Sequence, residues 1–371
     1  MNIEKIKLYS AKIKRRYPFR TSRAIQHHVD GVFVEIVTDN RIIGTGESSP
    51  RPHINEETLD GTFEELQVIS QELAGKIPRT ALDILHSNNY GPSARTGIEI
   101  ALLDAICQAK DIPICDYVDS FRARQQMSYC GLINSNIVNE ALVKKARLYK
   151  KDGFDIVRVK VGELDFEKDL ERVKMLHEIW QGKPAIWLDV NQSWSMPDAI
   201  RYFNELEPYD IIMVEQPLPA NAYEDHAELR KHTSIPIMID EGVQTPDDLD
   251  KVIETECADA VNLKFLKLGS IFVTAAEVER ARQAGLIAYC GATTITDVCA
   301  QYMRHLEASI NGLTYFSSGI PRSSCFVENP TIPQLTFNPR IPLAQRPTQP
   351  GLGIKLNHRI FDKYVIERWE T

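Results

Sequence analysis

The chain has 371 residues, of which 43% are hydrophobic and 25% are charged, and its formal net charge is −8 at pH 7. The length allows one large domain or two unequal ones, and the acidic balance offers no basic surface for nucleic acid or an anionic membrane. No apolar run has the length of a membrane span or of a signal-peptide core. The seven cysteines include no CxxC pair, so we expect reduced thiols and a cytoplasmic location.

The first 120 residues predict a small α+β domain. Three runs rich in β-forming residues predict an antiparallel meander over 2–15, 32–37 and 42–47. One long loop lies between its first two strands, at 17–23, and another lies between its third strand and the next helix, at 48–54. Long loops on a small domain often carry binding residues. Helices are predicted over 57–73 and 95–109, the second with an apolar stripe at spacings of three and four.

The next part of the chain repeats a strand-helix unit. Five short apolar runs, each ending on or carrying a charged residue, predict buried strands at 157–161, 186–190, 212–215, 237–240 and 260–264. The charges at Lys160, Asp189, Glu215, Asp240 and Lys264 are 29, 26, 25 and 24 residues apart, which suits one strand, one helix and two loops. Further strands at 127–132, 287–290 and 313–316 complete an α/β barrel. The C-terminal strand ends of such a barrel converge on one active-site face.

Helix starts and the chain end complete the outline. Ser195, Thr245 and Ser270 are predicted N-caps. Residues 326–350 are rich in proline and predict loops, and a last strand at 364–369 is expected to return to the N-terminal domain, because chain ends often lie together. The predicted domains are therefore a capping domain over 1–122, completed by about 355–371, and a barrel over 123–354.

Three carboxylates from three neighbouring strands predict a metal site. Asp189, Glu215 and Asp240 would repel one another at one face unless a cation lay among them. Hard oxygen ligands with positions left for substrate suit Mg²⁺, or Mn²⁺ in its place. The alternative is three separate ion pairs.

Two lysines flank this trio. Lys160 and Lys264 belong to strands on opposite sides of the barrel mouth, so each would face one side of a bound substrate. Arg158 lies two residues before Lys160 and points the same way. Its permanent charge favours the neutral lysine that a base needs. Together these groups predict abstraction of a proton α to a carboxylate, with a metal stabilising the enolate.

These motifs resemble the enolase superfamily, and within it the muconate-lactonizing subgroup, over nearly the whole chain. The matching segments are Val-Arg-Val-Lys at 157–160, Leu-Asp-Val-Asn-Gln-Ser-Trp at 188–194, Glu-Gln-Pro at 215–217, Asp-Glu at 240–241 and Asn-Leu-Lys-Phe-Leu-Lys-Leu-Gly at 262–269. The resemblance implies an α+β capping domain over a modified (β/α)7β TIM-like barrel, with Mg²⁺ and a lysine pair.

The resemblance also implies roles for individual residues. Catalysis would fall to Lys160, Lys264 and Arg158, and the metal to Asp189, Glu215 and Asp240. Candidate substrate contacts are Arg20, Arg23, His53, Lys267, Thr293, Ser317 and Ser318, and Asn191 and Glu241 would support the ligands. Lys267 is a structural residue in an alternative interpretation.

Two departures from the family pattern narrow the expected chemistry. Arg158 replaces the first lysine of the Lys-x-Lys motif and cannot lose a proton, so its role is electrostatic. Dipeptide epimerases carry an acid a few residues after the glycine of the seventh-strand loop, which is missing here after Gly291, and an Asp-x-Asp pair just after the eighth strand, which is missing here at 315–320. A free α-ammonium would lack its counter-charge there, which predicts weak use of L-Ala-L-Glu-type dipeptides unless Asp297 or Glu328 substitutes.

The leading interpretation is a metal-dependent racemase or epimerase of an amino-acid derivative, such as a dipeptide or an N-acyl amino acid. The alternatives within the superfamily are a cycloisomerase or a dehydratase. Outside it they are a ligand-binding barrel without turnover and a phosphate-binding barrel, which Gly291 and Gly319 support poorly. The expected partners are a small carboxylate substrate and further copies of the chain in a homo-oligomer, with neither nucleic acid nor membrane.

Overall fold

The computed structural model describes residues 1–20, 25–118, 126–180, 185–293, 295–314, 316–317, 325–336, 338 and 343–371. For Arg20, His53, Ala185, Phe316 and Ser317 only the backbone is described. Arg23 and Ser318 lie outside the described residues, as does the domain boundary expected between 122 and 123.

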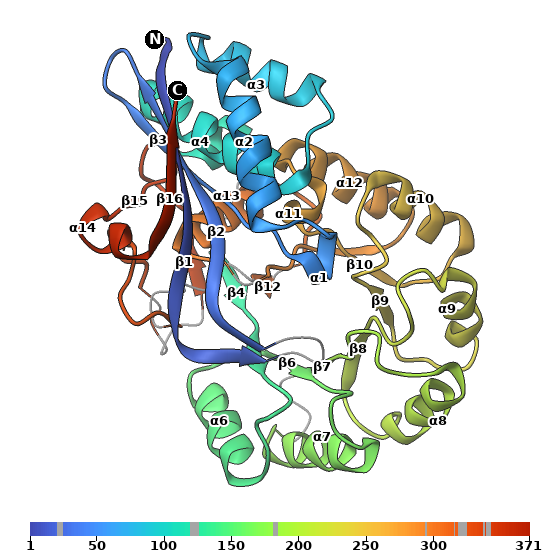
Figure 1. Ribbon diagram of the computed structural model, residues 1–371. Coiled ribbons are helices and arrows are strands. Elements are labelled where there is room, and N and C mark those ends of the chain that lie inside the picture. Colours follow the sequence, from blue (N-terminus) through green and yellow to red (C-terminus); the bar gives the residue numbers. More distant parts are fainter. Residues whose placement is uncertain are drawn as a thin grey trace.

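The N-terminal domain is built on a four-stranded antiparallel sheet in the order β16-β1-β2-β3. Its strands are β1 (Ile3–Arg20), β2 (Ile25–Thr38), β3 (Ile43–Ser48) and β16 (Val365–Glu370). Lys7 of β1 pairs with Glu370 of β16, so the last strand returns to the N-terminal domain as predicted. The two chain ends lie together at the top of the sheet (Figure 1).

Helices cover one face of this sheet. They are α1 (Pro52–Asn55), α2 (Leu59–Leu73), α3 (Pro78–Ser87), α4 (Pro92–Lys110) and α5 (Ile114–Val118). The α4 helix lies directly on β3, because Gly44 and Gly46 have no side chain there. A Cβ atom on Gly46 would lie 2.0 Å from the carbonyl oxygen of Gly97.

The second domain is a parallel β/α barrel. Seven strands pair in the sequential order β5 to β11, namely β5 (Gly131–Ile133), β6 (Ile156–Lys160), β7 (Ala185–Asp189), β8 (Ile211–Glu215), β9 (Ile237–Ile239), β10 (Ala260–Asn262) and β11 (Ile287–Tyr289). β4 (Gln126–Tyr129) runs into β5 and pairs with β12 (Phe316–Ser317), while Leu313 bridges Ala288 of β11. The eighth strand is thus short, and the modified TIM-like barrel has the expected form.

Several details differ from the sequence prediction. The loop predicted at 17–23 is strand as far as Arg20, where β1 ends, and the loop predicted at 48–54 runs into helix α1, which begins at Pro52. The first barrel strand is interrupted at Cys130, so it forms β4 and β5 in place of one run. The proline-rich segment predicted as loop contains β13 (Thr331–Ile332) and β14 (Leu343–Gln345), which pair with β15 (Lys355–Leu356) and β4 respectively. These two-to-three-residue strands depend on partners far along the chain, which local sequence patterns do not record.

The helices of the second domain form an outer ring around the strands (Figure 1). They are α6 (Asn139–Lys151), α7 (Phe166–Trp180), α8 (Met196–Leu206), α9 (Tyr223–Arg230), α10 (Pro246–Thr255), α11 (Phe265–Leu268), α12 (Ile271–Gln283) and α13 (Asp297–Ser309). The predicted N-caps Ser195, Thr245 and Ser270 each accept a first-turn backbone N–H. A short α14 (His358–Phe361) and the 3-10 turn Asp362–Tyr364 precede β16. No helix in the described part of the chain combines the length and apolar character needed to cross a membrane.

An apolar layer inside the barrel forms the floor of the candidate site. Its members are Cys130, Ile156, Trp187, Met213, Met238, Ala260 and Tyr289, one from the first strand region and one from each of β6 to β11. Side chains two residues apart on a strand point the same way. The residues two positions after the β6, β7, β8 and β9 members are Arg158, Asp189, Glu215 and Asp240, which therefore form the next layer toward the C-terminal strand ends.

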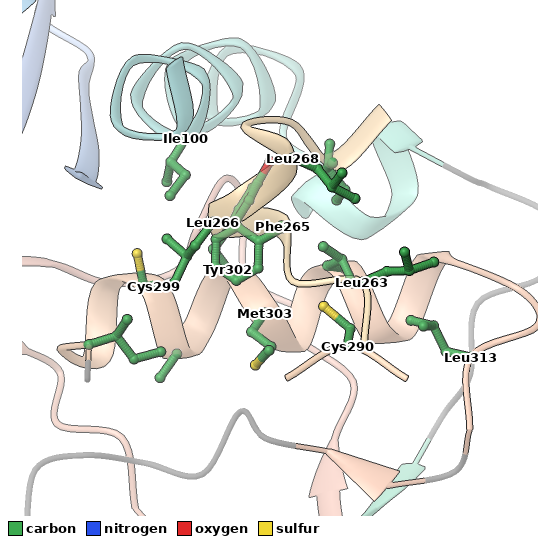
Figure 2. Packing of buried hydrophobic residues seen from close by; sticks show 14 of the residues in the cluster. Ile100, Leu263, Phe265, Leu266, Leu268, Cys290, Cys299, Tyr302, Met303 and Leu313 are labelled. Carbon is green, nitrogen blue, oxygen red and sulfur yellow. The ribbon is translucent and has the colours of Figure 1, made fainter. Parts of the chain in front are cut away.

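A second, larger core joins the barrel helices to the N-terminal domain. Figure 2 shows Ile100 of α4 above Leu266 of α11, with Leu268 on the other side of the α11 turn and Tyr302 of α13 below. All of these side chains are buried. The seven cysteines are free thiols, six of them buried, in agreement with the sequence prediction.

Candidate active site

The C-terminal ends of β6, β7 and β8 bring the first group of predicted site residues together. The strand register places Lys160 beside Asp189 and Asp189 beside Glu215. Lys160 Nζ lies 2.7 Å from Asp189 Oδ2. Arg158 Nη2 lies 2.6 Å from the same oxygen and 2.8 Å from Glu215 Oε1.

The ends of β9 and β10 supply the second group. Lys264 Nζ lies 2.5 Å from Asp240 Oδ2, and Lys267 Nζ donates to Asp240 Oδ1 at 3.1 Å and to its carbonyl oxygen at 2.6 Å. The row of carboxylates on β7, β8 and β9 is therefore flanked by a lysine at each end, Lys160 on β6 and Lys264 after β10. That each lysine faces one side of a bound substrate stays a prediction.

Burial makes the charges in this row depend on one another. Burial raises the pKa of Asp189, but Arg158 and Lys160 outweigh it and the net shift is downward. Burial, together with repulsion from Asp189 and Asp240, raises the pKa of Glu215 well above its usual value. Burial would lower the pKa of Lys264, but Asp240 and Glu215 raise it above the ordinary value. The middle of the row is thus where further positive charge would be most stabilising.

The donor set fits a divalent cation. Three buried carboxylates offer the hard oxygen atoms that Mg²⁺ prefers. Asp189 Oδ1 is buried and has no hydrogen-bond partner, which is uncommon for a buried acceptor. The carboxylates are otherwise turned toward lysine and arginine, and among the described residues no three His, Cys, Asp or Glu side chains gather closely enough to ligate one ion. The side-chain positions are therefore those of ion pairs, whereas the chemistry of the set suits a metal.

Neighbouring amides hold these groups in place. Lys160 Nζ donates to Asn191 Oδ1 at 2.7 Å, and Asn191 Nδ2 donates to Glu241 Oε1 at 3.1 Å. Asn262 donates to Glu215 Oε1 at 3.1 Å and accepts the backbone N–H of Gly291 at 2.7 Å. The sequence prediction gave Asn262 no role. Its signal was its position two residues before Lys264 in an apolar strand, which places it on the inner face.

Arg158 contacts the carboxylates themselves. Its guanidinium carbon lies 4.9 Å from the centre of the Trp187 ring, so the side chain rests on the apolar floor while Nη2 bonds Asp189 and Glu215. A cation stacked on an aromatic face in this way is stabilised by the ring quadrupole. Arg158 therefore donates hydrogen bonds to two of the expected metal ligands.

Of the residues expected to contact substrate, Lys267 and Thr293 have described side chains. Lys267 is 4% exposed and turned toward Asp240, which favours the structural interpretation. Thr293 follows β11, and its Oγ1 is buried without a hydrogen-bond partner. The side chains of Arg20, Arg23, His53, Ser317 and Ser318 lie outside the described residues.

The two acids considered as substitutes for the missing Asp-x-Asp pair are engaged elsewhere. Asp297 is buried and accepts from Asn329 Nδ2 at 3.2 Å. Glu328 forms an ion pair with Lys363 at 2.7 Å. Glu241 is different, because its Oε2 is buried without a hydrogen-bond partner.

Comparison with known families decides the relationship of the chain. Residues 3–118 match the N-terminal domain of mandelate racemase / muconate lactonizing enzyme, and residues 141–360 match the enolase C-terminal domain-like family. The chain belongs to the enolase superfamily. The resemblance read from the motifs is thereby confirmed.

The relatives of this superfamily member include racemases and epimerases, beside an o-succinylbenzoate synthase and a chloromuconate cycloisomerase. The D-Ala-D/L-Ala epimerase of Cytophaga hutchinsonii is 32% identical over 280 residues, covering 73% of this chain and 74% of the relative. The N-succinyl-L-Arg/Lys racemase of Bacillus cereus is 27% identical over 372 residues, covering 99% and 98%. The chain is accordingly an isomerase of the racemase and epimerase type.

Solved structures agree. The N-succinyl Arg/Lys racemase from Bacillus cereus superposes with a TM-score of 0.90 at 25% identity, with both chains covered completely. A dipeptide epimerase from Cytophaga hutchinsonii, solved with Mg and D-Ala-L-Val, gives 0.87 at 25% identity, again over both whole chains.

Proposed function

We propose that this enolase-superfamily member is a divalent-metal-dependent racemase that inverts the α-carbon of an N-acyl amino acid. The observation that carries the proposal is the pair of lysines, Lys160 and Lys264, at opposite ends of a row of three buried carboxylates. A substrate carboxylate held at this row would have one ammonium or amine group on each face of its α-carbon. Inversion needs that arrangement, because one group removes the proton and the other delivers one from the opposite side.

Asp189, Glu215 and Asp240 would hold Mg²⁺ or Mn²⁺, which supplies positive charge for the negative charge that develops on the substrate carboxylate. Lys160 Nζ takes or gives the α-proton on one face, and Lys264 Nζ does so on the other. Asn191 orients Lys160 through its 2.7 Å hydrogen bond. Arg158 holds Asp189 and Glu215 in the row and adds permanent charge beside them.

The lack of a suitably placed acidic residue supports a substrate whose α-nitrogen is acylated. Residues 315–325 contain neither Asp nor Glu, and Asp297 and Glu328 already have partners. A free α-ammonium bound there would be buried without a counter-charge, which is costly, whereas an acylated nitrogen carries no charge. The full-length match to a racemase of N-succinyl amino acids supports the same substrate class.

A second candidate is epimerisation of dipeptides. It is favoured by the 32% identity to a D-Ala-D/L-Ala epimerase. In this chain the free Oε2 of Glu241 would be the acceptor for the ammonium. The cytoplasmic location and the homo-oligomer expected from the sequence stay predictions.

Proton NMR in D2O tests the proposal directly. The purified protein with Mg²⁺ is incubated with N-succinyl and N-acetyl amino acids, dipeptides and hydroxy acids, and loss of the α-proton signal is followed. We expect exchange and racemisation of N-acyl amino acids, with no exchange after chelation. Comparing kcat/KM for one dipeptide with that of its N-acetylated form separates the two candidates. A strong preference for the free amine would favour the dipeptide epimerase, and loss of water or ring formation would point to a dehydratase or a cycloisomerase.

Lysine variants test the two-base arrangement. Lys160→Ala and Lys264→Ala should each abolish racemisation, while each retains α-proton exchange of the one enantiomer that faces the remaining lysine. Lys168→Ala, which removes an exposed lysine from α7, should leave the activity unchanged. Full racemisation by either of the first two variants would contradict the arrangement.

A further inference from the structure

A carboxylate of the N-terminal domain is buried against the barrel segment that carries Lys264. Glu99 lies in the middle of α4 and is fully buried. Its Oε1 accepts the backbone N–H of Ile271 at 2.8 Å and the hydroxyl of Tyr302 at 2.6 Å. Its Oε2 accepts the hydroxyl of Ser270 at 2.5 Å and lies 2.6 Å from His86 Nε2. Three of the four partners of Glu99 are thus donors, and three belong to the barrel domain.

The segment bound by Glu99 begins at Lys264. Lys264 is the N-cap of the one-turn helix α11, and Gly269 ends that helix with a left-handed backbone, φ 74°. Ser270 then caps α12. Pairing of β10 with β9 and β11 holds the strand that leads into this segment, and Glu99 holds its far end at Ser270 and Ile271.

The α4 helix also packs closely against the α11 segment. A Cβ atom on Gly269 would lie 3.0 Å from Pro92 Cα at the start of α4. Ile100, next to Glu99, points toward Leu266 of α11 (Figure 2). Apolar contact of this kind is non-directional, so the hydrogen bonds of Glu99 are what fix where along α4 the segment sits.

Lys160 is positioned in a different way, by groups of the barrel. Arg172 of α7 donates to the carbonyl oxygen of Lys160 at 2.9 Å and pairs with Asp169 at 2.7 Å. The other oxygen of Asp169 accepts the backbone N–H of Gly162 at 2.7 Å. The two lysines are therefore anchored by separate networks, one within the barrel and one reaching into the N-terminal domain.

We propose that Glu99 is a positioning residue for Lys264, through which the N-terminal domain sets the geometry of one face of the reaction. The inference rests on the proposed function, since it takes Lys264 as the group that serves one enantiomer. Loss of Glu99 would let α11 shift against α4 and displace Lys264 Nζ, while Lys160 keeps its own anchors. Because a displacement of about 1 Å can cost on the order of a hundredfold in rate, the effect should fall on one enantiomer.

The experiment compares α-proton exchange in D2O for the two enantiomers of one substrate. Lys264→Ala first identifies the enantiomer that faces Lys264, as the one that no longer exchanges. In Glu99→Ala we expect that enantiomer to exchange more slowly by on the order of tenfold or more. The opposite enantiomer should keep its rate, because Lys160 can remove the proton and return deuterium to the same face. Racemisation should fall together with the slower exchange.

A matched control is available on the same helix. Asp104 is also a buried carboxylate of α4, but in the described part of the chain it accepts hydrogen bonds from the backbone N–H groups of Thr45 and Leu352, which lie outside residues 264–271. Asp104→Asn should leave the ratio of the two exchange rates unchanged. Tyr302→Phe removes a single hydrogen bond from Glu99 and should change the ratio in the same direction by less. It therefore carries the test if Glu99→Ala does not fold.

Two outcomes would overturn the inference. Equal slowing of both enantiomers in Glu99→Ala and in Tyr302→Phe would mean that Glu99 only stabilises the fold, and an unchanged ratio would mean that Lys264 is held without it. Absence of exchange with every substrate in the unsubstituted protein is a different result, and it would contradict the proposed function instead.

Discussion

Among single residues, Arg158 most changes the electrostatics of the candidate site. It occupies the position of the first lysine in the Lys-x-Lys motif of the family. Its guanidinium donates hydrogen bonds to both Asp189 and Glu215. Lysine offers a single ammonium centre, whereas the planar guanidinium presents donors in a fixed fork and stacks on aromatic rings, as Arg158 does on Trp187. The electrostatic role expected for it therefore extends to the row of carboxylates as a whole.

A first residue-scale prediction follows for Arg158→Met. Methionine fills much of the same space but leaves Asp189 and Glu215 without their shared cation. Breaking a buried ion pair from one side costs about 3–5 kcal/mol, so the melting temperature in chelator should fall. Mg²⁺ should restore more of it than in the unsubstituted protein, because a ligand that binds only the folded state stabilises that state. Thermal unfolding with and without Mg²⁺ measures both effects.

Arg172→Met is the control for Arg158→Met. The Arg172→Met variant also loses a buried ion pair, the one between Arg172 and Asp169. The hydrogen bonds of Arg172 do not go to the three carboxylates of the row. The melting temperature of this variant should fall, and Mg²⁺ should raise it by no more than it raises that of the unsubstituted protein. An Mg²⁺ response of equal size in both variants would mean that Arg158 and the metal do not share ligands.

Among the elements, β3 and α4 approach each other closely in the N-terminal domain. This approach depends on Gly44 and Gly46, where Cβ atoms would lie 2.0 Å from the carbonyl oxygens of Ala101 and Gly97. Helix and strand cannot approach so closely with side chains between them. The α4 helix, which carries Glu99, owes its position to these two glycines.

Gly46→Ala should accordingly destabilise the protein at the upper end of the roughly 1–3 kcal/mol typical of overpacking. The measurement is the urea midpoint of unfolding. Gly61→Ala is the comparison, because Gly61 is exposed on α2 and its Cβ would meet only the end of the Thr58 side chain at 3.0 Å. Alanine favours a helix over glycine by roughly 0.5–1 kcal/mol, so this variant should be no less stable. Similar midpoints for both variants would contradict the argument from close approach.

The first backbone N–H groups of two barrel helices donate to carboxylates of the N-terminal domain. Glu99 accepts the backbone N–H group of Ile271, the first residue of α12, and Glu47 of β3 accepts the backbone N–H groups of Thr296 and Cys299 at 2.9 and 3.0 Å at the start of α13. The first N–H groups of a helix have no partner within the helix, and negative charge is favourable there. Each carboxylate therefore completes a helix and joins the two domains at the same time.

In the molecule as a whole, the C-terminal segment, α14 to β16, is hydrogen-bonded to the N-terminal sheet. His358 of α14 bonds Glu35 of β2 at 2.9 Å and Asp362 at 3.1 Å, and Glu35 also accepts the hydroxyl of Tyr9 at 2.9 Å. Burial would lower the pKa of His358, but the hydrogen bonds and charges of Glu35 and Asp362 raise it above the ordinary 6.5. The protonated imidazole is thus the form that ties the chain end to the sheet.

This gives a pH prediction. Because the pKa is higher in the folded state, the stabilisation by His358 is fully present below about pH 6.5 and is lost as the pH rises through the folded-state pKa. The stability difference between the unsubstituted protein and His358→Gln should therefore shrink from pH 6 upward. Urea midpoints across this range measure it, with His27→Gln, an exposed histidine of β2, as the control. A difference that grows with pH would show that the neutral imidazole makes the contact.

The sequence by itself determined the barrel, the row of charges and several helix starts. Strand ends repeat at near-constant spacing, and a charged residue within an apolar run is costly unless it meets a partner, so Lys160, Asp189, Glu215, Asp240 and Lys264 could be placed at one face. Thr245 and Ser270 could be assigned as N-caps because a cap depends on residues within one turn. These features are local, and local patterns record them.

Only the tertiary structure decided which groups the charges meet. Arg158 was expected to act on Lys160, yet its hydrogen bonds go to carboxylates 31 and 57 residues away. Glu99 looked like one more position on an amphipathic helix, and its partners Ser270 and Ile271 lie 171 and 172 residues later. A buried carboxylate must find donors, but sequence periodicity cannot say from which distant segment they come, because that depends on how two domains pack against each other.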